Sequence, residues 1–159
     1  MTELTQTILK TLKAHTWTVA FGESLTAGYG VSALASQDGI SEVLRGGVVC
    51  YDIPTKVRLL KVDQNFAEAC NAVSERTAQE MAQGCTEMFD SDVGVSTTGY
   101  ATLWKNFPLE AFVAVYHRET QQLFSTRVDL SRLNDRESRR RFCAEEALTM
   151  LLRSLSPQL

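Results

Sequence analysis

The stretch WTVAFGESLTAG, residues 17–28, is the part of the sequence that decides the fold class. Its first five residues, 17–21, form a short apolar run that is typical of a buried strand. The seven residues that follow are mostly small, and a helix is predicted to begin near Thr26 and to end at about Ala35. A buried strand that turns tightly into a helix is a building unit of α/β domains.

The rest of the chain continues this alternation of helices and strands. Helices are predicted over residues 4–13, from Pro54 onwards, over 74–89 and over 135–154. Strands are predicted over residues 48–51, 92–99, 111–117 and 122–130, and the last two form a hairpin around Glu119 and Thr120. The sequence therefore predicts one domain over residues 1–159, a three-layer α/β/α sandwich with a mixed β-sheet.

Composition excludes several classes of function. The net charge of −3 gives no general attraction for nucleic acid, so no nucleic-acid partner is expected. No segment reaches the roughly 18 apolar residues of a membrane span, and the N-terminal residues lack the pattern of a secretory signal. The four cysteines are spread without a CxxC pair, and the two histidines are far apart in sequence, so no zinc site is predicted. Reduced thiols in a cytoplasmic protein are the expectation.

Ser24 is the first candidate for chemistry. It follows the predicted strand directly and precedes the predicted helix, where backbone N–H groups can bind an anion or a developing oxyanion. A serine at such a turn resembles the nucleophile of a strand–turn–helix elbow. The alternative is that Ser24 or Thr26 simply caps the helix, as Ser and Thr commonly do.

Three further residues lie near predicted strand ends or helix starts. Lys56 falls in the first turn of the helix that Pro54 begins, where the helix dipole disfavours an ammonium group and burial would favour the neutral amine, a general base. Tyr51 ends the preceding strand and can hydrogen-bond a nucleophile or a substrate. Thr98 ends another strand and can donate to a carbonyl or a phosphate. The alternatives are a solvated lysine, a half-buried aromatic and a threonine that closes a turn.

Four arginines occupy positions 136–141, at the start of the last predicted helix, which Asn134 or Asp135 can cap. Arg136 and Arg140 are four residues apart on one helical face and could clamp a phosphate. The alternative is a solvated face in which the arginines pair with Glu137, Glu145 and Glu146.

These signals occur in an order that resembles the CinA C-terminal domain family, which includes the nicotinamide-nucleotide amidohydrolases. The resemblance covers nearly the whole chain. Its motifs are GESLTAG at 22–28, GGVVCY at 46–51 with Lys56 at the family's spacing, AVSE at 72–75, TG at 98–99, and DR at 135–136 followed by Arg140 and AL at 147–148.

The resemblance implies hydrolysis of the carboxamide of nicotinamide mononucleotide to nicotinate mononucleotide and ammonia. It implies that Ser24 is the nucleophile, that Lys56 is the general base and that Tyr51 assists. No metal or other cofactor is implied. The residues implied to bind a pyridine nucleotide or to order its site are Thr26, Thr98, Gly99, Arg136 and Arg140.

Two departures from the family pattern leave a second reading open. Leu25 and Ala27 stand where the family has cysteine and glycine, and alanine is costly if position 27 needs a positive φ. Residues 100–108 replace a glycine-rich loop with an aromatic one, in which Trp104 could stack on a ring, fill the pocket or join a subunit interface. A diverged paralogue that binds a nucleotide or partner without turnover is therefore the alternative, and self-association of the chain is expected.

Overall fold

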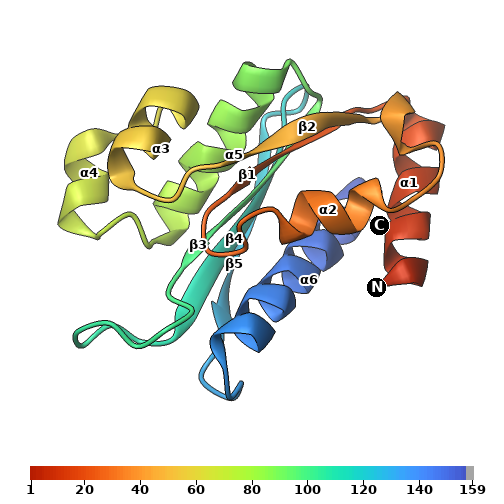
Figure 1. The fold of residues 1–159 in the computed structure, drawn as a ribbon. Coiled ribbons are helices and arrows are strands. Elements are labelled where there is room, and N and C mark those ends of the chain that lie inside the picture. Colours follow the sequence, from red (N-terminus) through yellow and green to blue (C-terminus); the bar gives the residue numbers. More distant parts are fainter. Residues whose placement is uncertain (157–159) are drawn as a thin grey trace.

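The protein's structure, a computed structural model, describes residues 1–156 and is built on one five-stranded sheet (Figure 1). The strands lie in the order β2-β1-β3-β4-β5. The first three are parallel, and β4 and β5 form an antiparallel hairpin beside β3. Their bounds are β1 Val19–Glu23, β2 Leu44–Val49, β3 Val93–Gly99, β4 Glu110–His117 and β5 Gln122–Asp129.

Helices cover both faces of this sheet and complete the predicted three layers (Figure 1). One face carries α1, α2 and α6, which cover Thr2–His15, Tyr29–Ala35 and Arg136–Leu155. The other carries α3, α4 and α5, which cover Ile53–Leu60, Gln64–Ala69 and Glu75–Phe89. A short 3-10 helix, η1, lies at Ile40–Glu42. The prediction of a mixed α/β/α sandwich is confirmed.

Side-chain caps begin helices α3, α5 and α6. The Ser74 hydroxyl accepts the Thr77 N–H at the start of α5, and an Asp135 carboxylate oxygen accepts the Ser138 N–H at the start of α6. Pro54 lies in the first turn of α3, which Asp52 caps. These local bonds satisfy N–H groups that have no partner inside the helix.

Several predicted boundaries are wrong. β2 covers Leu44–Val49 rather than residues 48–51, and β1 begins at Val19 rather than Trp17. The helix expected from Thr26 begins at Tyr29, because the chain first makes a turn in which Ala27 and Gly28 have φ angles of 47° and 97°. Helix α4 was not predicted, since its six residues are too few to show a periodicity.

The carboxyl ends of the three parallel strands lie at one edge of the sheet. Glu23, the last residue of β1, pairs with Val49 on β2 and with Thr97 on β3. The segments that follow these strands therefore meet at one edge of the sheet, which is where α/β folds bind ligands. Within residues 1–156, no helix combines the length and the apolar character needed to cross a membrane.

Candidate active site

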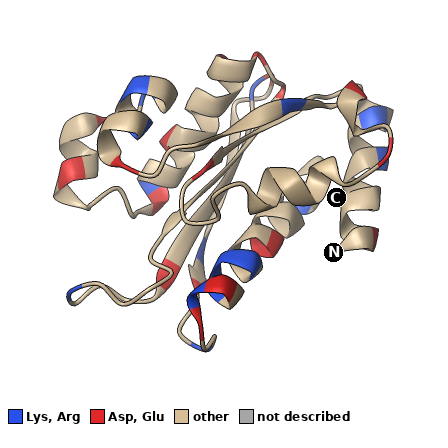
Figure 2. Cartoon of the chain, viewed as in Figure 1, with Lys and Arg blue, Asp and Glu red and all other residues tan. Residues whose placement is uncertain are grey.

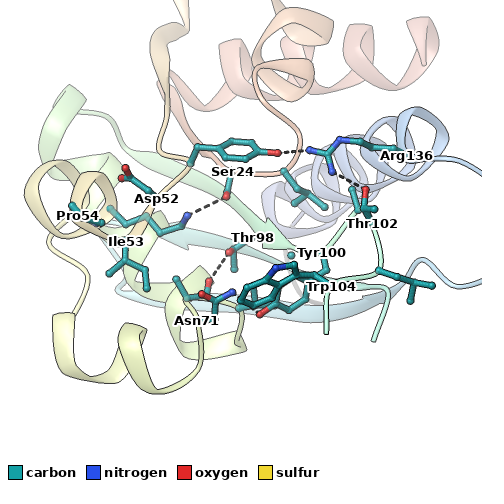
Figure 3. A pocket seen from close by; sticks show the side chains of 18 residues that line it. Ser24, Asp52, Ile53, Pro54, Asn71, Thr98, Tyr100, Thr102, Trp104 and Arg136 are labelled. Atoms are coloured by element: carbon teal, nitrogen blue, oxygen red, sulfur yellow. Dashed lines mark hydrogen bonds between the residues drawn. The ribbon is translucent and has the colours of Figure 1, made fainter. Parts of the chain in front are cut away.

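Ser24 lies at this edge, in a cleft of about 610 Å³ lined by segments that follow β1, β2 and β3. A volume of this size lies within the range of about 300–1,000 Å³ found for small-molecule sites. Ser24 is 7% exposed, and its backbone N–H donates to the Thr97 carbonyl at 3.0 Å. It does not cap α2, whose N-cap is Gly28. Its side chain instead faces a buried amine (Figure 3).

That amine belongs to Lys56, which is 2% exposed. Its Nζ lies 3.1 Å from the Ser24 Oγ and donates to the Cys50 carbonyl at 2.8 Å. Burial penalises the ammonium form and lowers the pKa of Lys56 from 10.5 to about 8, although the negative charge of Asp52 opposes this shift. The solvated-lysine alternative is therefore wrong, and Lys56 can exchange a proton with Ser24 near neutral pH.

Tyr51 and Arg136 meet at the mouth of the cleft. The Arg136 guanidinium donates to the Tyr51 hydroxyl and, at 3.0 Å, to Thr102 Oγ1 (Figure 3). Tyr51 is 56% exposed and lies beyond the end of β2, so it is not a half-buried strand aromatic. Among residues 1–156, Arg136 makes no ion pair with a carboxylate. Because it also lines the cleft, its positive charge is available to an anionic ligand.

Thr98 and Gly99 line the cleft at the end of β3. The Thr98 hydroxyl donates to the Ala72 carbonyl at 2.6 Å. Its single proton is thus in use, which corrects the expectation that Thr98 donates to a substrate: it can only accept from one. A Cβ at position 99 would lie 2.5 Å from the Glu110 carbonyl oxygen, so the close approach of β4 requires glycine there.

Glu23 is the residue that the sequence analysis missed. Its carboxylate is 1% exposed and accepts the Gly28 and Val31 N–H groups, each at 2.8 Å, and the Thr26 hydroxyl at 2.5 Å. It therefore supplies the acceptor for the start of α2 that the capping alternative assigned to Ser24 or Thr26. An acidic residue at the end of an otherwise apolar strand is the signal that could have identified it.

Thr26 and Arg140 do not line the cleft, so the expectation that they bind the nucleotide directly is wrong. The Thr26 side chain is fully buried against Glu23. Arg140 reaches from α6 to the turn after β1, where its Nε donates to the Leu25 carbonyl at 2.9 Å and a terminal nitrogen lies 3.4 Å from the Thr26 carbonyl. The predicted clamp of Arg136 and Arg140 on one phosphate is therefore not formed.

The remaining arginines of the cluster are structural. Arg139 donates to the carbonyls of Leu130, Leu133 and Ala101, and so fixes the loops beside α6. Arg141 pairs with Glu137, which also pairs with Arg140. Figure 2 shows these mixed charges at the beginning of α6. The alternative of a paired, solvated face is correct for Arg141 but not for Arg139, which binds backbone carbonyls.

The aromatic loop between β3 and β4 forms one wall of the cleft and projects beyond the sheet (Figure 1). Tyr100, Trp104 and Phe107 stack with ring centroids 5.0–6.0 Å apart. The Asn71 amide donates to the Tyr100 hydroxyl at 2.9 Å and anchors the stack. Tyr100 and Trp104 face the cleft, and the rings leave its centre open (Figure 3). Among residues 1–156, no three His, Cys, Asp or Glu side chains are grouped to hold a metal ion.

Comparison with solved structures shows the same fold. The competence damage-inducible protein A from Klebsiella pneumoniae is 26% identical, with a TM-score of 0.91 over 99% of this chain and 98% of that chain. A protein of the CinA superfamily from Escherichia coli is 28% identical, with a TM-score of 0.88 over 95% of this chain and 88% of that one.

Comparison of sequences gives partial matches to longer proteins, and a family model matches nearly the whole chain. CinA-like proteins from Chlorobaculum tepidum and Chlorobium limicola are 44% and 40% identical over 98 and 100 residues. Those matches cover 62% and 63% of this chain but only 23% of either relative. The model of the CinA C-terminal domain matches residues 1–155. The chain therefore belongs to the CinA C-terminal domain family.

Proposed function

We propose that this protein hydrolyses the carboxamide of nicotinamide mononucleotide, using Ser24 as the nucleophile and Lys56 as the general base. The observation that carries the proposal is the 3.1 Å contact between Lys56 Nζ and Ser24 Oγ within a cleft. A buried amine with a pKa of about 8 can take the serine proton at neutral pH, which a solvated lysine cannot do efficiently.

The proposed reaction has two stages. In the first, neutral Lys56 takes the hydroxyl proton while Ser24 Oγ bonds to the amide carbon and the carbonyl oxygen becomes an oxyanion. The tetrahedral intermediate collapses, Lys56 returns the proton to the leaving nitrogen, and ammonia departs from the acyl-enzyme. In the second stage, water gives a proton to Lys56 and attacks the ester carbon. Lys56 then returns that proton to Ser24 Oγ as the ester bond breaks, which releases nicotinate mononucleotide and regenerates both residues.

Three other groups fit parts of this substrate. Thr98 Oγ1 can accept from the carboxamide NH₂, since its own proton is held by Ala72. Arg136, at the cleft mouth without a carboxylate partner, can bind the phosphate. Trp104 lines the cleft and its ring already attracts a cation, the Lys105 ammonium 4.3 Å from the ring centroid, so a positively charged pyridinium ring can take that place when Lys105 moves aside.

The test is ammonia release from nicotinamide mononucleotide by the purified protein and by Ser24→Ala and Lys56→Ala. Both substitutions should abolish turnover while leaving the circular dichroism spectrum unchanged. Ser32→Ala and Lys10→Ala remove an exposed serine and an exposed lysine from other helices and should retain full activity. Turnover that survives in Ser24→Ala would refute the proposed nucleophile.

The second candidate function is binding without turnover, and the rebuilt loop is the observation that favours it. The stacked rings of this loop give the cleft an apolar wall. They stand where a glycine-rich loop would bring backbone N–H donors close to a ligand. A wild-type protein whose melting temperature rises with nicotinamide mononucleotide, but which releases no ammonia, would support this function over hydrolysis.

A further inference from the structure

The turn that carries Ser24 is held from two sides by opposite charges. On the sheet side, the buried Glu23 carboxylate accepts the Gly28 and Val31 N–H groups. On the α6 side, the Arg140 guanidinium donates to the Leu25 and Thr26 carbonyls. One group thus binds the N–H donors of the turn and the other binds its carbonyl acceptors.

The Glu23 carboxylate occupies a space that its neighbours leave for it, and it accepts hydrogen bonds from them. A Cβ at position 30 would lie 3.0 Å from Glu23 Oε1, so the small Gly30 leaves the space that the carboxylate occupies. The Thr26 hydroxyl gives its one proton to Glu23, and Thr97 therefore donates to Thr26 at 2.7 Å. A buried carboxylate is tolerated only when hydrogen bonds of this kind satisfy it.

This arrangement leaves two backbone donors beside the nucleophile free. Within residues 1–156, the N–H groups of Leu25 and Thr26 donate to no acceptor, whereas the Ser24 and Ala27 N–H groups donate to the Thr97 and Ser24 carbonyls. Of these two residues, Leu25 lies on the wall of the cleft and Thr26 does not, so the Leu25 N–H is the donor that a ligand in the cleft can reach.

We infer that Glu23 and Arg140 are positioning residues, which hold the turn so that the Leu25 N–H can bind the oxyanion formed at Ser24. The inference rests on the proposed serine chemistry. Neither side chain touches the substrate: both act through the backbone between them. Oxyanion donors must be fixed before the reaction, because donors that have to reorient lose much of their effect.

The test measures covalent labelling of Ser24 by a fluorophosphonate, followed by intact-mass spectrometry. This reagent needs a serine nucleophile and an oxyanion site but no pyridine nucleotide. Glu23→Gln keeps the size of the side chain but not its charge, and Arg140→Lys keeps the charge but not the fork that reaches two carbonyls. Each should slow labelling by at least about tenfold, since loss of one oxyanion donor costs about 100- to 1,000-fold. The exposed Glu42→Gln should label at the wild-type rate.

A parallel measurement separates positioning from loss of structure. Ser24→Cys is combined with each variant, and alkylation of the introduced cysteine by iodoacetamide is followed by peptide mapping. Alkylation displaces iodide and forms no oxyanion, so its rate should change less than about threefold in the same backgrounds. Slowing of both reactions together would overturn the inference and indicate a displaced or unfolded turn.

The outcomes also separate this inference from the proposed function. If the wild type is labelled and both variants are labelled equally fast, the inference fails while the nucleophile stands. If the wild type is not labelled, the proposed serine chemistry fails and the inference falls with it. Where nicotinamide mononucleotide is turned over, Glu23→Gln should lower kcat at least tenfold with KM nearly unchanged.

Discussion

The guanidinium of Arg136 binds the hydroxyl of Tyr51 across the mouth of the cleft, although 85 residues separate the two in sequence. A second nitrogen of the same group binds Thr102. Both acceptors are neutral, so the contact fixes the direction of the guanidinium without neutralising it. Arg136 is thus a cation oriented by the segments after β2 and β3, and it lines the same cleft as Ser24.

Arg136→Ala should therefore weaken binding of the phosphorylated substrate specifically. We expect KM for nicotinamide mononucleotide to rise about 10- to 100-fold, the usual effect of losing a hydrogen bond between charged groups, with kcat little changed. KM for nicotinamide riboside, which lacks the phosphate, should stay within about threefold. Steady-state kinetics on both substrates measure the difference. Arg141→Ala, which removes an exposed arginine of the same helix, serves as control. An equal rise in KM for both substrates would contradict the assignment.

Activity should increase with pH through the pKa of Lys56. The amine must be neutral to accept the serine proton, and burial lowers its pKa to about 8. At pH 7 about one tenth of the enzyme would hold the neutral form, so kcat/KM should rise about tenfold per pH unit and level off above pH 8. The measurement is a pH–rate profile, with Lys56→Arg expected to be inactive throughout because a guanidinium keeps its proton.

Asp52 provides a variant that tests the same pKa. Its negative charge favours the protonated form of Lys56, and its side chain caps α3 by accepting the Thr55 N–H. Asp52→Asn preserves a capping oxygen but removes the charge. The pH–rate profile of this variant should move to lower pH. A profile that moves to higher pH, or a wild-type rate that falls between pH 6 and pH 8, would exclude Lys56 as the base.

The sequence predicted the members of the site that depend on local order along the chain. Ser24 follows a strand, Pro54 begins a helix and Lys56 lies in its first turn, so strand-end geometry brings the serine and lysine to one edge. This prediction requires only that the strands be parallel, because parallel strands end at the same edge of a sheet. It also predicted the hairpin and the layers, because periodicity reports which faces are buried.

Sequence reasoning could not predict where long side chains point. Arg136 and Arg140 share one helical face, yet one faces the cleft and the other binds the turn behind it. That choice depends on carbonyls more than a hundred residues away in sequence. Glu23 was missed for a similar reason, because its burial depends on space left by Gly30 and on donors that appear only once α2 has formed.

Ala27→Gly should stabilise the protein. Ala27 has a φ of 47°, a left-handed conformation that costs a residue with a Cβ about 1 kcal/mol or more. Glycine removes this cost but gains entropy in the unfolded chain, so a net gain of up to about 1 kcal/mol in the free energy of unfolding is expected. Urea denaturation measures it. Ala33→Gly, inside helix α2, should instead destabilise by about 1 kcal/mol. Equal destabilisation by both would contradict the strain at position 27.

Stability should fall as the pH drops below about 6.5, because His117 resists protonation when folded. It is 5% exposed, lies against Trp17 and Phe124, and contacts the Ser154 hydroxyl at 3.0 Å. Burial, with His15 nearby, lowers the pKa of His117 below 6.5. Between the two pKa values the unfolded chain binds more protons, so folding is disfavoured as pH decreases.

The measurement for His117 is the free energy of unfolding at pH 7.5 and pH 5.0 in the wild type and in His117→Gln. Glutamine keeps a hydrogen-bonding nitrogen for Ser154 but does not titrate in this range. The loss of stability on acidification should therefore be smaller in the variant than in the wild type. A loss that is equal in both would assign the acid sensitivity to other groups.

The aromatic loop should also mediate self-association. Leu103 is 71% exposed and Trp104 and Phe107 are 43% and 37% exposed, so three large apolar side chains are in contact with water on one projecting segment. Apolar surface gathered in this way is typical of an interface.

Light scattering should give the wild type a mass above the 17.7 kDa of one chain. Leu103→Asp should reduce this mass, because a charge at the centre of the contact would have to be desolvated. Met88→Asp, which charges a 44%-exposed apolar residue on α5, should leave the mass unchanged. A wild-type mass equal to one chain would assign the exposed loop to the cleft alone, with Trp104→Ala then expected to raise KM without any change in mass.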